Sequence, residues 1–386
     1  MRILHVIPSV APRYGGPSYA VLGFCRALRA RGVETLIATT NADGHGELPV
    51  RIGVPTTYEG VDAVFFSRRG EAFKYSGALA RWLGQNVAGF DVVHIHAVFS
   101  HPSLAAGRAC RARGVPYVVR PLGTLDPWSL TQRAWKKRVL LATSVRTLVA
   151  RASAMHFTAA DEHRLAAPVA GSVPGVVIPP GVDDRYLAAR PLPMAERDRR
   201  IVALARLDPK KRLDALIRAF HVVASMPGLT DWRLTIAGDG PADHRAALLQ
   251  LARSGPASER IEFPGWIDGD DKQGLLGRSA IFALPSHQEN FGMALVEAMA
   301  CGVPAVVSAS VNLSPDVARV RAGWVADDTD AGLADTLRSA MSDEGERGRR
   351  ALAARDLAAQ FTWAAAAEQL EALYASVCGH TVGASR

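Results

Sequence analysis

Residues 284–307 read LPSHQENFGMALVEAMACGVPAVV. The apolar run that ends at Leu284 predicts a buried strand, and Pro285 predicts a turn at its carboxyl end. Residues 293–300 predict a helix, and the apolar run 305–308 predicts a second strand. Strand, helix and strand in this order are typical of a parallel α/β sheet. In open sheets of this class, ligands bind at the carboxyl ends of the strands.

Two carboxylates lie eight residues apart around the start of this helix. Glu289 precedes it, and Glu297 lies about one turn inside it. The amides of Gly292, Met293 and Ala294 would be unpaired first-turn donors, which favour an anion. A phosphate beside hydroxyl-binding carboxylates describes a nucleotide-sugar site. The alternative is an ordinary helix whose apolar residues face a core.

A second group of candidate residues follows the strand predicted at 200–205. Arg206 comes directly after this strand, and Lys211 precedes the next helix. An arginine can hold a phosphate with two hydrogen bonds, and a lysine adds a point charge. Together they could neutralise a departing diphosphate. The alternative is that both are loop charges in water.

The same alternation of strands and helices fills the chain in two series. The predicted strands are 2–7, 34–39, 63–66, 91–96, 117–120 and 154–158 in the first series, and 200–205, 233–237, 261–263, 280–284, 305–308 and 323–325 in the second. The stretch 171–184, GSVPGVVIPPGVDD, predicts a stiff linker. We therefore predict an α/β protein of two Rossmann-like domains, at residues 1–180 and 181–362.

Composition excludes several classes of protein. The 386 residues are 48% hydrophobic and 21% charged, which excludes intrinsic disorder, and no apolar run is long enough to span a membrane. The four cysteines are widely spaced, so we expect neither zinc nor disulfides, and a cytoplasmic protein. The net charge of +8 is uneven. Residues 1–190 hold 23 Lys and Arg against 12 Asp and Glu, whereas residues 191–386 hold 22 against 25.

Taken together, these segments resemble the retaining glycosyltransferases of family 4, which have the GT-B fold. The resemblance rests on a series of motifs in the family's order: PRYGGPSYAV (12–21), VIPPGVD (177–183), ARLDPKKRLDALIRAF (205–220), LTIAGDGP (234–241), IEFPGWI (261–267), PSHQENFGMALVEAMACGVPAVVS (285–308) and FTWAAAAEQLEALY (361–374). RPLGTLDPWSL (120–130) resembles a subgroup common in bacterial surface-polysaccharide assembly. The resemblance implies two parallel sheets facing an interdomain cleft, and a C-terminal helix, 363–377, that packs back on the first domain.

The resemblance also implies residue roles. Arg206 and Lys211 would hold the donor diphosphate, Glu289 the sugar hydroxyls and Glu297 the ribose. The remaining implied donor contacts are the amides of Phe291, Gly292, Met293 and Ala294, the loop residues Gly265 and Trp266 beside the base, and Gly16. Gly15 and Gly16 would let the backbone approach the diphosphate and the acceptor.

One family feature is missing. Many members carry a histidine after the strand 117–120, where this chain has Leu122. We consider His96, His101, Arg120 and Asp126 as replacements on the acceptor side. We expect His94 and His96 to face opposite sides of their strand. Asp126 could equally start a turn.

The reaction implied is transfer of a hexose, with retention and without a metal or other cofactor, from a nucleoside-diphosphate sugar to a hydroxyl of a glycan or a polyprenyl-diphosphate-linked acceptor. The motifs leave the base (UDP, GDP or ADP), the sugar and the linkage open. A sugar-nucleotide epimerase with the GT-B fold is one alternative. A non-catalytic nucleotide or nucleic-acid binding protein is another, although no nucleic-acid motif is present.

Residues 131–151, TQRAWKKRVLLATSVRTLVAR, predict a basic amphipathic helix. One interpretation is contact with an anionic membrane surface, with the protein peripheral at the inner face of the membrane. The other is a surface helix whose apolar side packs on its own domain.

Overall fold

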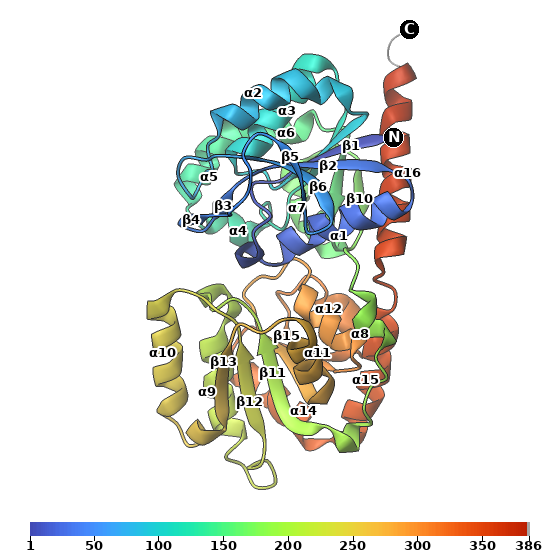
Figure 1. The fold of residues 1–386 in the computed structure, drawn as a ribbon. Helices are drawn as coiled ribbons and strands as arrows, with labels where there is room; N and C mark the ends of the chain where they lie inside the picture. Colours follow the sequence, from blue (N-terminus) through green and yellow to red (C-terminus); the bar gives the residue numbers. More distant parts are fainter. Residues whose placement is uncertain (384–386) are drawn as a thin grey trace. The chain divides into compact units, whose positions relative to one another are not determined.

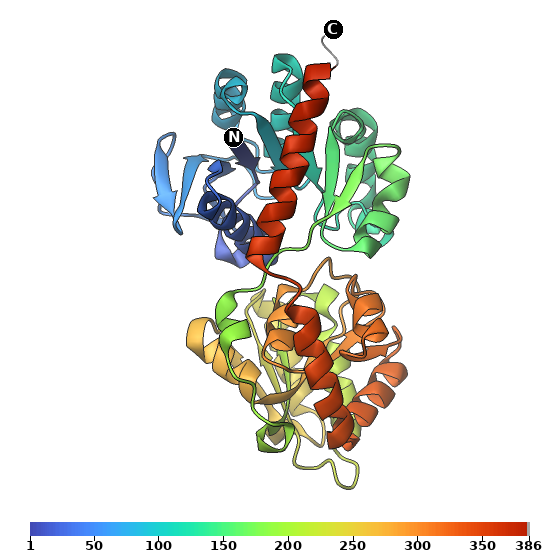
Figure 2. The same ribbon diagram turned by 90° about the vertical axis from the view of Figure 1, so that its right-hand side faces the viewer.

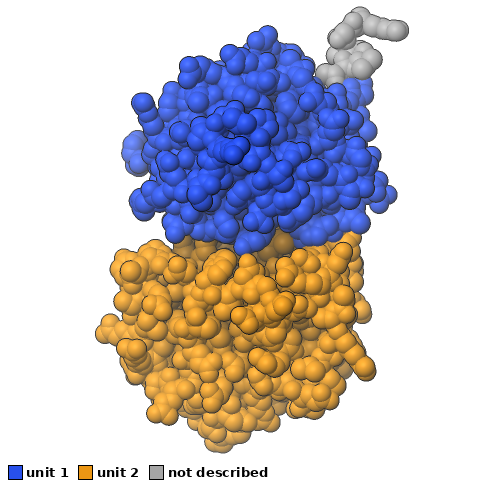
Figure 3. Space-filling view, in the orientation of Figure 1, with its two compact units in different colours: residues 1–181, 363–386 blue, residues 182–362 orange. Residues whose placement is uncertain are grey.

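The computed structural model describes residues 1–383, with side chains to residue 379. The chain divides into two compact units (Figures 1 and 3). Unit 1 comprises Met1–Gly181 together with the C-terminal segment from Trp363, and unit 2 comprises Val182–Thr362. Each unit is built around its own parallel sheet covered by helices.

The sheet of unit 1 has eight strands in the order β10-β9-β8-β7-β1-β2-β6-β5. Neighbouring strands are parallel except β5, which is antiparallel to β6. Their bounds are β1 Arg2–Val6, β2 Glu34–Thr40, β5 Pro55–Tyr58, β6 Val61–Phe66, β7 Val92–His96, β8 Tyr117–Arg120, β9 Ala154–Phe157 and β10 Gly175–Val177. A separate hairpin pairs β3 Ala42–Asp43 with β4 Gly46–Glu47.

The helices of unit 1 connect these strands. They are α1 Gly16–Ala30, α2 Gly77–Asn86, α3 His101–Arg113, α4 Pro127–Thr131, α5 Ala134–Leu140, α6 Arg146–Ala150, α7 Ala160–Ala170 and the C-terminal α16 Trp363–Gly383. Helix α16 lies beside α1 and completes this unit (Figure 2). Ala367, Leu370 and Tyr374 of α16 are fully buried in one core with Ile3 and Phe24.

The sheet of unit 2 has six parallel strands in the order β13-β12-β11-β14-β15-β16. Their bounds are β11 Asp198–Leu204, β12 Arg233–Ala237, β13 Ile261–Gly265, β14 Ser279–Leu284, β15 Ala305–Ser308 and β16 Gly323–Ala326. The helices are α8 Asp184–Ala188, α9 Leu213–Val223, α10 Ala242–Arg253, α11 Gly269–Arg278, α12 Met293–Ala300, α13 Ser314–Arg319, α14 Asp330–Ser342 and α15 Glu344–Ala358.

The predicted fold class, two Rossmann-like domains with parallel sheets, is confirmed. Five helices of the described chain were not predicted: the short α4, α8 and α13, and the longer α7 and α15. Helix α7 contains Pro168, which argues locally against a helix. Helix α15 has the sequence EGERGRRALAARDLA, in which charge obscures any apolar stripe.

The basic segment differs from the single helix expected at 131–151. It forms α5, a π-helical turn at Leu141–Val145, and α6. Val145 and Leu148 are buried in unit 1, whereas Trp135 and Val139 are 69% and 55% exposed. The apolar side therefore packs on its own domain at one end only. Among residues 1–383, no helix is both long and apolar enough to cross a membrane.

Candidate functional site

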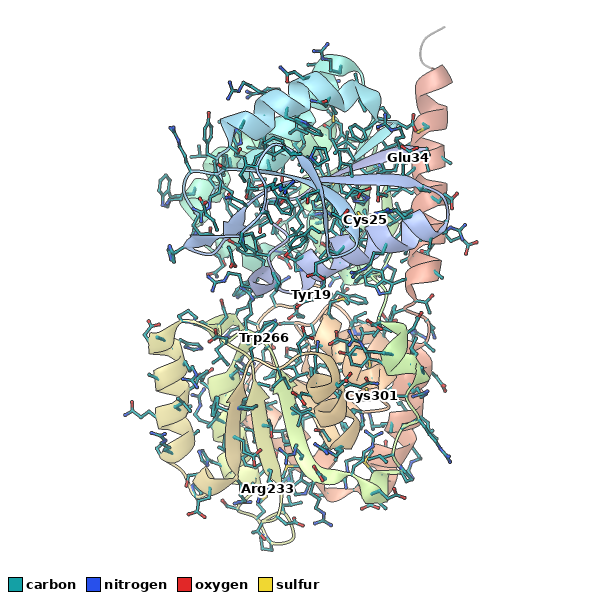
Figure 4. The ribbon with its side chains drawn as sticks, in the orientation of Figure 1. Tyr19, Cys25, Glu34, Arg233, Trp266 and Cys301 are labelled. Atoms are coloured by element: carbon teal, nitrogen blue, oxygen red, sulfur yellow. The ribbon has the colours of Figure 1, made fainter. Side chains whose placement is uncertain are left out.

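The candidate donor residues of unit 2 gather at the carboxyl edge of its sheet. Arg206 follows β11, Gly265 ends β13, and Glu289 lies in the loop after β14. Gly265 has φ +84°, a conformation that favours glycine, and the next residue, Trp266, is 49% exposed. Figure 4 shows Trp266 at this edge and Arg233, which begins β12, at the opposite edge.

The start of α12 has the geometry expected of an anion site. Gly292 is the N-cap residue with φ +78°, and hydrogen bonding within the helix begins with the Leu295 amide, which donates to the Gly292 carbonyl at 2.8 Å. The amides of Met293 and Ala294 therefore have no partner within the helix. The side chain of Phe291 is buried, edge-on to Phe361 at 5.3 Å between ring centroids, so only its backbone is available to a ligand.

Glu289 is held by a lysine. Lys211, at the end of the 3₁₀ turn Pro209–Lys211, donates a hydrogen bond to Glu289 Oε2. Burial opposes ionisation of Glu289, but Lys211, Lys210 and Arg206 outweigh it and hold the pKa of this carboxyl below its ordinary value. Glu289 is therefore a firmly ionised acceptor within a cationic loop.

Glu297 has a different environment. Its Oε2 lies 2.7 Å from Nζ of Lys272 on α11, an ion pair that the sequence did not predict. Burial raises the pKa of Glu297 above its ordinary value, although Lys272 opposes that rise. The two carboxylates thus have pKa shifts of opposite sign, and such pairs mark sites where related groups take different roles.

In unit 1, the glycine loop lies at the carboxyl end of β1. Gly15 has φ +73°, and Gly16 is the first residue of α1. The neighbouring Tyr14 is fixed in a network. Its hydroxyl donates to Glu71 Oε1 at 2.6 Å and accepts from the Gly44 amide at 2.9 Å. The loop therefore has a defined conformation before any ligand binds.

The histidines of unit 1 form a buried cluster that corrects our expectation for His94 and His96. Their rings stack at 4.4 Å between centroids, because side chains two residues apart on a strand point to the same face. His96 is fully buried and shares a 3.0 Å hydrogen bond with His5. Its ring therefore packs within the sheet face and is not exposed to a ligand.

One choice of tautomers satisfies all the hydrogen bonds of His94 and His156. His156 Nε2 donates to the Ile178 carbonyl at 2.7 Å, so its Nδ1 accepts from His94 Nε2 at 3.2 Å. His94 Nδ1 then accepts from the Tyr374 hydroxyl at 2.7 Å. This chain of neutral groups connects β7 and β9 to α16.

The cluster does not fit a metal centre well. His5, His94 and His96 offer nitrogens that lie within 4.8 Å of one another. However, His94 uses both nitrogens in the hydrogen bonds described above, and the positive charge of Arg120, which acts on all three rings, would oppose a bound cation. These features favour hydrogen-bonded neutral imidazoles.

The other acceptor-side candidates lie at the ends of neighbouring elements. Arg120 is 2% exposed, with its guanidinium 5.0 Å from the Phe24 ring centre, and burial lowers its pKa to about 10. Asp126 is a buried residue at the N-cap position of α4. His101 begins α3, and its Nδ1 accepts from the Ser76 amide at 3.2 Å. The structure also shows buried Glu162 accepting from the amides of Gly123 and Thr158, a loop anchor that the sequence did not indicate.

Each unit matches a family of known proteins. Residues 187–357 match the family described as glycosyl transferases group 1, and residues 15–181 match the glycosyl transferase 4-like domain. The matched ranges include all the donor residues of unit 2 described above.

Similar curated proteins span the chain. A D-inositol 3-phosphate glycosyltransferase of Stackebrandtia nassauensis is 28% identical over 93% of this chain and 86% of its own length. A phosphatidyl-myo-inositol mannosyltransferase of Propionibacterium freudenreichii is 29% identical over 100% of this chain and 97% of its own length.

Solved structures share the fold. HepE of Anabaena in complex with UDP and glucose has a TM-score of 0.77 at 20% identity, covering 97% of this chain and all of that one. Sucrose-phosphate synthase from Thermosynechococcus elongatus has a TM-score of 0.78 at 20% identity, covering 98% and 99% of the two chains.

Proposed function

Since the chain is a glycosyltransferase of the GT-B fold, we propose that it transfers a hexose, with retention of configuration, from a nucleoside-diphosphate sugar to a hydroxyl of a phosphate-bearing acceptor. The observation that carries this proposal is the carboxyl edge of unit 2. There, a cationic loop, two partly buried carboxylates and an open helix start lie together in one unit.

The proposed role of the cations and the helix start is to stabilise the leaving diphosphate. Arg206, Lys211 and the amides of Met293 and Ala294 would act electrostatically, which is usually the largest contribution to catalysis in such sites. The incoming hydroxyl would approach the face that the diphosphate leaves, and a phosphate oxygen would take its proton. This mechanism requires neither a metal nor a strong protein base.

The donor contacts follow from the two carboxylates. Ionised Glu289 would accept hydrogen bonds from sugar hydroxyls, and Glu297 from the ribose. Lys211 donates a hydrogen bond to Glu289 in the structure, and donor binding would redirect its charge toward the diphosphate.

The acceptor proposal rests on charge and on the relatives. The excess of positive charge lies entirely in residues 1–190, with 23 basic against 12 acidic residues. A domain with this excess of positive charge favours binding of a phosphate-bearing molecule. We propose a polyprenyl-diphosphate-linked glycan of bacterial surface-polysaccharide assembly. The names of the relatives make inositol phosphate the acceptor to test against it.

The exposed residues of α5 support contact with an anionic membrane surface. Trp135 and Val139 are exposed beside Lys136 and Arg138, and the sequence 127–160 contains no acidic residue. We expect the protein to float with vesicles containing anionic lipid at moderate salt and the variant W135A/R138E to float less. Equal recovery of both proteins, or no flotation, contradicts this surface role.

A binding panel followed by a transfer assay tests the proposed function. UDP, GDP and ADP, with their sugars, are each added to the protein, and the cognate nucleotide should raise the melting temperature. The cognate sugar nucleotide is then incubated with each acceptor class and without acceptor. Acceptor-dependent glycoside formation supports transfer. Conversion of the sugar to its epimer without an acceptor would instead identify an epimerase. A rise in melting temperature with duplex DNA alone would identify a nucleic-acid binding protein.

A further inference from the structure

Lys272 reaches Glu297 from a neighbouring helix. It lies in the first half of α11 and Glu297 in the middle of α12, and their charged atoms are 2.7 Å apart. The side chains are only 20% and 13% exposed. An ion pair in such a position is more strongly coupled than one on the surface, because water screens it less.

The surroundings of Glu297 disfavour its charged form. Burial is the largest influence on its pKa and raises it, and Asp268 adds to this effect. Lys272 is the largest opposing influence. The titratable and charged groups that interact with the Glu297 carboxyl are Lys272, Asp268, Arg185, Tyr186 and Cys301. Tyr186 and Cys301 have raised pKa values themselves and stay neutral at pH 7.

We propose that Lys272 is a positioning residue that keeps Glu297 ionised and oriented to accept hydrogen bonds from the ribose hydroxyls of the donor. The role rests on the proposed function. An ionised carboxylate only accepts, so it matches two neighbouring hydroxyl donors, whereas a protonated one carries a donor that conflicts with one of them. Lys272 needs no contact with the nucleotide for this effect.

The test compares nucleotides that differ only at the ribose. The wild-type protein and Lys272→Met are titrated with the cognate nucleoside diphosphate and its 2′,3′-dideoxy form, called the deoxynucleotide below, taken from UDP, GDP and ADP and their dideoxy counterparts. We expect Lys272→Met to lower the affinity for the ribonucleotide by about tenfold, because hydrogen bonds to a charged carboxylate are lost. The affinity for the deoxynucleotide should remain nearly unchanged. Lys272→Arg should retain most of the wild-type affinity for the ribonucleotide, because arginine keeps the positive charge.

Two further variants separate this role from a structural one. Arg278→Met removes an exposed cation from the end of the same helix and should bind both nucleotides like wild type. Lys272→Met/Glu297→Gln removes both charges together, so no unpaired buried charge remains. It should show the same loss toward the ribonucleotide as Lys272→Met alone, and it serves if the single variant does not fold.

The pH dependence gives a readout that packing alone would not change. Ribonucleotide affinity of Lys272→Met should recover as pH rises, because Glu297 then ionises without its partner, whereas the double variant should show no such recovery. Equal loss of both nucleotides, no loss, or a similar loss in Arg278→Met overturns the role of Lys272. If the wild-type protein binds none of the three nucleoside diphosphates, the proposed function itself is overturned, and the positioning role with it.

Discussion

Mild acid should destabilise the first unit selectively through its buried histidines. His5 is fully buried, and burial, together with the charge of Arg120, lowers its pKa from 6.5 to about 3. A base whose pKa is depressed in the folded state binds its proton mainly after unfolding. Its contribution to stability is therefore fully present above pH 6.5 and is lost as the pH falls toward 3.

The loss can be estimated from His5 alone. Between pH 7.5 and pH 5, a pKa of about 3 folded against 6.5 unfolded costs about 2 kcal/mol of stability. That corresponds to roughly a thirtyfold decrease in the protection of the surrounding amides. His94, His96 and His156, whose pKa values are also lowered well below 6.5, act in the same direction.

Hydrogen exchange measured by mass spectrometry resolves the two units within the intact chain. Peptides covering β1 and β7 should lose protection between pH 7.5 and pH 5, after correction for the intrinsic exchange rate. Peptides covering β11 and β14 of unit 2 provide the internal control. In His5→Gln the loss of protection in β1 and β7 between pH 7.5 and pH 5 should be smaller by about the factor calculated for His5. If β1 and β7 lose no more protection than β11 and β14, the reasoning from the histidine cluster is refuted.

Three other predictions follow from single contacts. Lys211→Ala should lower the rate of sugar transfer by about a hundredfold or more, and near-normal turnover in a transfer assay would contradict its role at the diphosphate. Gly292→Ala should lower the free energy of unfolding by about 1–2 kcal/mol, because φ +78° strains any L residue. An unchanged midpoint in denaturant unfolding would show that the loop adapts. Tyr374→Phe should cost about 1 kcal/mol by losing the 2.7 Å hydrogen bond to His94, and exchange in β7 should increase, whereas unaltered exchange would mean that water replaces the hydroxyl.

Much of the fold could be predicted from the sequence because buried parallel strands are short apolar runs. Strands β8, β12 and β15 have the predicted bounds, and so does α12. The prediction was poorer where local signals conflict with tertiary packing. Pro168 sits within α7, and the π-helical turn at Leu141–Val145 divides a segment whose charge pattern is continuous.

The candidate site likewise has features that the sequence predicts and a contact that it does not predict. Arg206 and Glu289 follow strands, so a parallel topology brings them to one edge, and the sequence was sufficient to group them. The partner of Glu297 was not predictable, since Lys272 comes from another helix and the contact exists only after the helices pack. The spacing of His94 and His96 did contain the information that their rings share a face, and our opposite expectation was an error of interpretation.

The discontinuity of unit 1 has a consequence for synthesis on the ribosome. Unit 2 is one uninterrupted stretch, Val182–Thr362, and can fold as soon as it emerges. Residues 1–181 of unit 1 precede unit 2 but need Leu370 and Tyr374 of α16 to fill their core. Residues 1–181 must therefore wait, with Ile3 and Phe24 uncovered, until α16 has left the exit tunnel. A chain that terminates early, just after Thr362, would release a finished second unit attached to an unfinished first one, a form that quality-control proteases should recognise.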